Sequence, residues 1–180
     1  KMAMQTAFTG KNYAKDPAGS VETVTALTAT ATKAYWQSIF TKSRLVIVIV
    51  ADLERKIIEE KVKELLAKVP AGTPFKSTKS SYTPTANSFK PLQRENATNY
   101  VQGITSGPQP GSPDFNAFVL AMRIFSNKHF IEIRTKNGLS YAPGAWFSAG
   151  TTSYSNIYVT TTDPNKYIAV VRQLIDKIKQ

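Results

Sequence analysis

Two side chains in the segment FIEIRTKNGLSYAPGAWF, residues 130–147, could hold a peptide without cleaving it. Arg134 carries a planar guanidinium whose donors form a rigid fork, and Tyr141, seven positions later, adds a phenol hydroxyl. Both groups can donate hydrogen bonds to carbonyl oxygens or steady an oxyanion. Neither can break an amide bond alone, so the spacing raises the question of a substrate-binding pair without a reaction centre. The residues equally fit a structural role, in which the arginine caps a helix C-terminus and the tyrosine packs at the start of a strand with its hydroxyl at the rim.

The rest of the composition argues against catalysis by this chain. Metal hydrolysis needs about three protein ligands and an open position, but the chain has one histidine, His129, no cysteine and twelve scattered Asp and Glu residues. One histidine excludes an H-x-x-E-H pair, and no G-x-S-x-G elbow or phosphate-binding glycine loop is present. We therefore expect no catalytic residue, metal ligand or cofactor here. We expect His129 to be structural or exposed, and Glu132 to be a solvated charge.

Length and charge narrow the class of protein further. A chain of 180 residues with 42% hydrophobic residues suits one folded domain, and no apolar run approaches the roughly 20 residues of a membrane-spanning helix. The net charge of +11 would suit nucleic acid or anionic lipid, but the basic residues are scattered and form no dense stripe. A nucleic-acid partner is therefore disfavoured. The absence of cysteine leaves the compartment open, since a periplasmic or cell-envelope location is as compatible as the cytosol.

The first twenty residues are polar and unpatterned and lack the apolar core of a signal peptide. From this start we expect the sequence to begin partway through a longer protein. We expect residues 1–20 to be a lead-in from a preceding domain and residues 21–180 to form the domain itself.

The first half of the domain should alternate helices and strands. Thr28 can cap a helix that runs to about residue 39, and residues 44–51, RLVIVIVA, are typical of a strand covered on both faces. Asp52 should cap a strongly amphipathic helix over residues 53–69. After a loop rich in proline, residues 87–94 and 97–107 predict an antiparallel pair.

The second half should place Arg134 and Tyr141 between a helix and a strand. Ser112 and Pro113 can open a core helix, and Asn137-Gly138 favours a turn with positive φ. Two strands should follow at residues 139–150 and 155–162, and Asp163-Pro164 should start the last helix. About five strands and four or five helices predict an α+β fold: a two-layer α/β sandwich with a mixed or mostly antiparallel sheet and helices on one face.

The segment IRTKNGLSY has the pattern R-x-x-x-G-L-x-Y and resembles a signature in the second domain of insulinase and pitrilysin family zinc metallopeptidases, including mitochondrial-processing-peptidase-like proteins. Phe130 stands where that family has a phenylalanine four residues before the arginine. The order of the preceding elements is also similar, so the resemblance covers nearly the whole chain. His129 departs from the family pattern, which usually has an apolar residue there.

The resemblance implies a division of labour between domains. In that family a first domain supplies the H-x-x-E-H zinc site, and a homologous later domain supplies an arginine and a tyrosine across an enclosed chamber. It thus implies that Arg134 and Tyr141 bind a peptide or protein substrate, that Gly138 provides the turn, and that zinc belongs to another domain or a partner subunit. An alternative is a structural scaffold with no substrate role, in which Arg134 would be a buried member of an ion pair.

Overall fold

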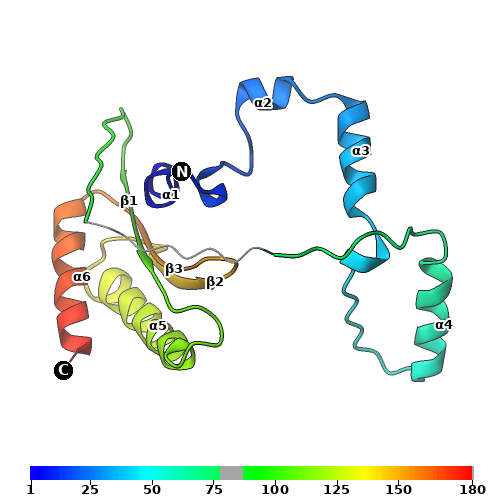
Figure 1. The fold of residues 1–180 in the computed structure, drawn as a ribbon. Helices are drawn as coiled ribbons and strands as arrows, with labels where there is room; N and C mark the ends of the chain where they lie inside the picture. Colours follow the sequence, from blue (N-terminus) through cyan, green and yellow to red (C-terminus); the bar gives the residue numbers. More distant parts are fainter. Residues whose placement is uncertain (78–86, 180) are drawn as a thin grey trace. The chain divides into compact units, whose positions relative to one another are not determined.

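The α+β class expected from the sequence is confirmed by an antiparallel sheet packed against helices. The computed structural model describes residues 1–77 and 87–179 of the chain. It divides into two compact units, Ala18–Ser77 and the remainder, Lys1–Pro17 with Thr78–Gln180 (Figure 1). No helix in the described ranges is both long and apolar enough to cross a membrane.

The larger unit is built on a three-stranded antiparallel sheet. Its strands are β1 (Asn99–Ser106), β2 (Gly144–Ala149) and β3 (Ser153–Thr161), in the order β1-β3-β2. Tyr158 of β3 lies opposite both Gln102 and Gly144, which defines the register. The two strands expected at residues 139–150 and 155–162 are therefore confirmed and pair with each other, and the first of them starts only at Gly144.

Two helices cover one face of this sheet, α5 (Phe115–Phe130) and α6 (Pro164–Ile178) (Figure 1). The core lies between them and β3, and its buried members are Ile133, Val159, Tyr167 and Val171. Helix α6 begins as expected, because a side-chain oxygen of Asp163 accepts a hydrogen bond of 2.9 Å from the Lys166 N–H.

The N-terminal residues pack on the opposite face of the sheet. They contain α1 (Met2–Ala7) and the short 3-10 helix η1 (Asn12–Ala14). Phe8 is fully buried, and its ring centroid lies 5.3 Å from that of Tyr154. Because successive strand residues point to opposite faces, Tyr154 faces away from Val159 and the helices. Residues 1–17 are thus an integral part of this unit.

The smaller unit is mainly helical. Its elements are α2 (Val21–Thr25), α3 (Ala29–Ile39), the 3-10 helix η2 (Lys42–Arg44) and α4 (Arg55–Leu65). Thr28 caps α3 as expected, because its hydroxyl oxygen accepts a 3.1 Å hydrogen bond from the Ala31 N–H. On α4 an ion pair of 2.7 Å links Arg55 to Glu59 at the i,i+4 spacing that supports helices.

The prediction of a central strand at residues 44–51 is wrong. Residues 45–50 belong to no strand, and Val46, Val48 and Val50 are 83–96% exposed. Ile47 and Ile49 are about half as exposed, so burial still alternates with the period of a strand. The pattern favours a strand, but strands need a hydrogen-bonded neighbour, and none of the described residues of this unit pairs with the segment.

The prediction that residues 87–94 and 97–107 form an antiparallel pair is also wrong. Only the second segment forms a strand, β1, and its partner is β3, far along the chain. Gly103 allows this pairing to be close, since a Cβ there would lie 2.8 Å from Cγ1 of Ile157. Two predicted caps are wrong as well, because α4 follows Glu54 rather than Asp52, and α5 follows Asp114 rather than Ser112.

Candidate substrate-binding site

The arginine lies on a helical extension of α5. After Phe130 the backbone widens into a π-helix, η3 (Ile131–Lys136), a form that often occurs at functional sites. Buried side chains anchor this stretch, because His129 and Ile133 are both fully inaccessible to solvent. Arg134 follows Ile133 directly, so a core residue positions its backbone.

Gly138 ends the helix and reverses the chain. Its φ is +60°, a region that side chains with a Cβ rarely adopt, and its N–H donates a 3.1 Å hydrogen bond to the Arg134 carbonyl. The next residue, Leu139, donates a 2.9 Å bond to the Ile133 carbonyl, and the Asn137 side chain donates one of 2.8 Å to the Glu132 carbonyl. The expected turn at Asn137-Gly138 is therefore present.

This turn brings the two predicted residues together. The Arg134 Cζ atom lies 4.1 Å from the centroid of the Tyr141 ring and 5.1 Å from that of Phe130. Both distances are within the range of cation–π attraction, worth roughly 0.5–1 kcal/mol at exposed sites. Phe130 reaches the guanidinium because it lies four residues earlier, on the same side of the helix.

The pair is open to solvent. Tyr141 is 79% exposed and Arg134 is partly exposed. Among the ion pairs found across residues 1–77 and 87–179, none involves Arg134, and the Glu132 carboxylate is occupied by Lys136 at 2.7 Å. The guanidinium donors and the phenol hydroxyl can therefore reach an external acceptor.

His129 is structural, which is one of the two environments expected for it. Its Nε2 lies 2.9 Å from the Tyr167 hydroxyl, and its ring stacks on Phe125. Its Nδ1 is buried and has no hydrogen-bond partner among the described atoms. Burial lowers the pKa of His129 to about 4 and raises the pKa of Tyr167, because an apolar setting penalises the charged form of each.

The residues do not fit a zinc ion. No group of three or more His, Cys, Asp or Glu side chains suitable for a metal occurs in the described part of the chain. The one histidine is enclosed in the core against Tyr167. No step of metal chemistry can therefore be assigned to these residues.

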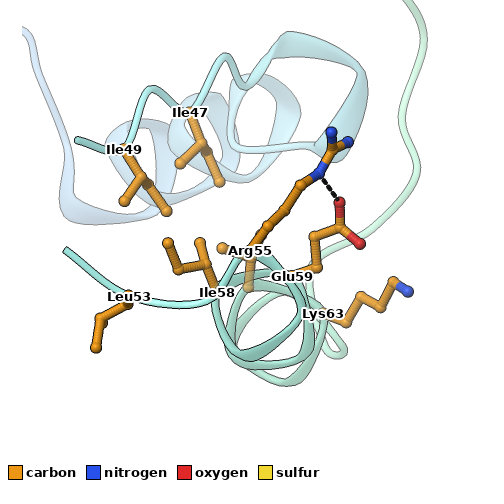
Figure 2. A pocket seen from close by; sticks show the side chains of 8 residues that line it. Ile47, Ile49, Leu53, Arg55, Ile58, Glu59 and Lys63 are labelled. Atoms are coloured by element: carbon orange, nitrogen blue, oxygen red, sulfur yellow. Dashed lines mark hydrogen bonds and ion pairs between the residues drawn. The ribbon is translucent and has the colours of Figure 1, made fainter. Parts of the chain in front are cut away.

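A separate apolar pocket of about 500 Å³ lies in the smaller unit, between residues 47–53 and α4 (Figure 2). Figure 2 shows Ile47 and Ile49 facing Ile58, with the Arg55–Glu59 ion pair at the side. The charged groups of that pair satisfy each other at 2.7 Å. The pocket thus offers packing surface rather than a set of convergent polar groups.

The described residues thus combine an α+β fold, a solvent-open contact between Arg134 and Tyr141, and no group of side chains suited to a metal. The family model described as "Peptidase M16 inactive domain" matches residues 26–180, and the chain belongs to this family. It is a non-catalytic domain. The match starts beyond residue 20, so a boundary between lead-in and domain near that residue stays a prediction.

A solved structure supports the fold. The chain is similar to the crystal structure of a peptidase M16 inactive domain from Pseudomonas fluorescens, with a TM-score of 0.77 and 18% sequence identity. The similarity covers 98% of this chain and 44% of that chain, so the present sequence spans less than half of its structural relative. No curated relative matches the chain in sequence.

Proposed function

We propose that this domain clamps extended peptide substrate for a zinc-bearing domain, which lies in the same polypeptide or in a partner subunit. The observation that carries the proposal is the pairing of Arg134 with Tyr141 at an open surface. Zinc is assigned to the other domain because the described residues here offer no ligand set.

The chemistry of the pair suits peptide carbonyls. Arg134 presents several N–H donors in one plane, and Tyr141 restricts that plane by stacking, which lowers the entropy lost when a ligand binds. Beside a partner's metal, the same donors would also stabilise the oxyanion that forms during amide hydrolysis. The role is therefore binding and orientation, with bond cleavage left to the partner.

The sheet offers a second element of recognition. Strand β2 is an edge of the described sheet and begins three residues after Tyr141. An extended peptide that added to such an edge would gain backbone hydrogen bonds. It would pair with a strand that starts only three residues after the phenol in the sequence. This arrangement would explain why the turn at Gly138 places the tyrosine just ahead of a strand.

Reconstitution with a zinc-bearing homologous subunit tests the proposal. The purified chain should confer peptidase activity on the mixture, and Arg134→Ala and Tyr141→Phe should each reduce it about tenfold or more, the loss of one charge-assisted or phenolic hydrogen bond. Arg172→Ala and Tyr100→Phe are matched controls, since both side chains are exposed and belong to α6 and β1 rather than to the segment that holds the pair. Full activity in both test variants would refute the assignment.

The scaffold alternative predicts a different environment for Arg134. A structural arginine would be buried in an ion pair, whereas this guanidinium is partly exposed and pairs with no carboxylate in the described ranges. No observation therefore favours the scaffold over the clamp.

A further inference from the structure

A second surface, unrelated to Arg134 and Tyr141, lies between α5, η3 and α6. It is a groove of about 470 Å³ whose floor is apolar. The floor consists of Ile124 and Ile131 from the first helical stretch and Leu174 and Ile178 from α6. Leu174 is buried, but Ile124 is 45% exposed and Ile131 is 40% exposed. Two of the four floor residues are therefore substantially exposed to solvent.

The rim of the groove is basic. Lys128, Lys136 and Lys177 surround the floor, against the single carboxylate of Glu132. That carboxylate is bound by Lys136 at 2.7 Å. Neither Lys128 nor Lys177 belongs to an ion pair within the described residues. Two ammonium groups thus remain available beside exposed isoleucines.

The lysine charges converge on one place. The pKa of Glu132 is lowered first by its hydrogen bond to Lys136 and then by the charges of Lys136, Lys177 and Lys128. Lysines on two different helical segments therefore act on the same carboxylate. A ligand carboxylate entering the groove would meet the same field.

We infer that this groove docks an acidic amphipathic helix of a protein partner. Ile124, Lys128 and Ile131 follow the spacing i, i+4, i+7 on one side of the helix and alternate apolar and cationic contacts. The floor from Ile124 to Ile131 extends roughly 10 Å along the helix axis, enough for two turns of a docked helix. Apolar side chains of the partner would fill the valley, and its flanking carboxylates would pair with Lys128 and Lys177.

The openness of the groove favours a helix over a small molecule. Small ligands bind in sites that enclose most of their surface, roughly 70–90%, whereas the isoleucines here are nearly half exposed. The concave floor between two helical segments also differs from the convex apolar ridge that inserts into a membrane. This inference does not depend on the proposed clamp.

Titration of the ¹⁵N-labelled 180-residue chain with a model peptide tests it. The probe is a two-turn to four-turn helix with leucines along one side and glutamates flanking them, and a second peptide has lysine at every glutamate. The acidic peptide should shift the amide signals of Ile124, Ile131 and Ile178. The lysine peptide should bind at least tenfold more weakly.

Variants separate the groove from overall charge. Lys128→Glu with Lys177→Glu should weaken binding of the acidic peptide at least tenfold, and Ile124→Ser should weaken it severalfold. Lys90→Glu with Lys166→Glu changes the net charge equally at exposed positions outside the groove and should leave binding nearly unchanged. Equal losses in both double variants would overturn the inference, as would absence of shifts at the groove at millimolar peptide. Phosphatidylserine vesicles that bind while the acidic peptide does not would overturn it in favour of a lipid surface.

Discussion

Acidification should destabilise the sheet-bearing unit through His129 well before its carboxylates protonate. The ring is fully buried, its Nε2 contacts the Tyr167 hydroxyl at 2.9 Å, and its Nδ1 has no partner among the described atoms. A protonated ring would carry an unpaired donor and an uncompensated charge in the core. The pKa of His129 is therefore lowered to about 4 from its ordinary value of 6.5.

The sign and size of the effect follow from proton linkage. Between pH 6.5 and 4 the unfolded chain holds a proton on His129 that the folded chain excludes, so stability falls as the pH falls. The slope approaches about 1.4 kcal/mol per pH unit, which gives about 2 kcal/mol lost from the free energy of unfolding between pH 7.5 and 5. In the same unit, the hydrogen bond from Lys136 lowers the pKa of Glu132 below its ordinary value of 4.5, so its contribution is lost only at a pH below that value.

Urea unfolding followed by the fluorescence of Trp146 measures this loss. The chain has two tryptophans, and Trp36 lies in the smaller unit, so a Trp36→Phe background restricts the signal to the unit that contains His129. His129→Gln in that background is the control, because glutamine does not titrate and its amide can still bond to the Tyr167 hydroxyl. Between pH 7.5 and 5 the protein with His129 should lose about 2 kcal/mol more of its free energy of unfolding than the His129→Gln variant. Equal losses would refute the reasoning.

Three further changes test the elements that position the site, each by urea unfolding. Gly138→Ala should lower the free energy of unfolding by about 1 kcal/mol, because the φ of Gly138 is +60°. The added Cβ would meet no atom within 4 Å, so the loss would come from backbone conformation alone. Gly138→Asn should therefore lose less, and equal losses would contradict a conformational cause. Asp163→Ala should cost about 1 kcal/mol through loss of the α6 cap, and Asp176→Ala, exposed on the same helix, should cost little. Phe8→Ala should lower the free energy of unfolding by about 3 kcal/mol or more, because Phe8 is fully buried, while Phe89→Ala, 81% exposed, should be nearly neutral.

The local features around the site are predictable because they depend on near neighbours in the sequence. A capping residue and a following apolar stripe define a helix, which is why the predicted starts at Thr28 and Asp163 are confirmed. The Asn137-Gly138 step predicts positive φ, and the structure has it at Gly138. This turn alone is enough to bring Arg134 and Tyr141 into contact. The stacking of Phe130 on Arg134 is an addition from the structure, although its i,i+4 spacing is a readable signal.

Strand partners are not predictable in the same way. Residues 97–107 are correctly predicted as a strand, but the predicted partner is the segment just before them, whereas β1 pairs with β3. Register and pairing depend on contacts between distant residues, such as the fit of Ile157 against Gly103. Residues 44–51 have the composition of a buried strand, yet composition cannot supply a neighbouring strand.

The sequence alone shows one histidine and no cysteine, which is too few residues for the standard zinc ligand sets, and it singles out Arg134 and Tyr141 as the candidate pair. The environment of those residues follows only from the folded structure. The fold encloses His129 in the core and leaves Arg134 and Tyr141 stacked at the surface. The physical reason is that residue type and spacing depend on the chain alone, whereas burial, and with it pKa and access to a ligand, depends on what distant segments bring alongside.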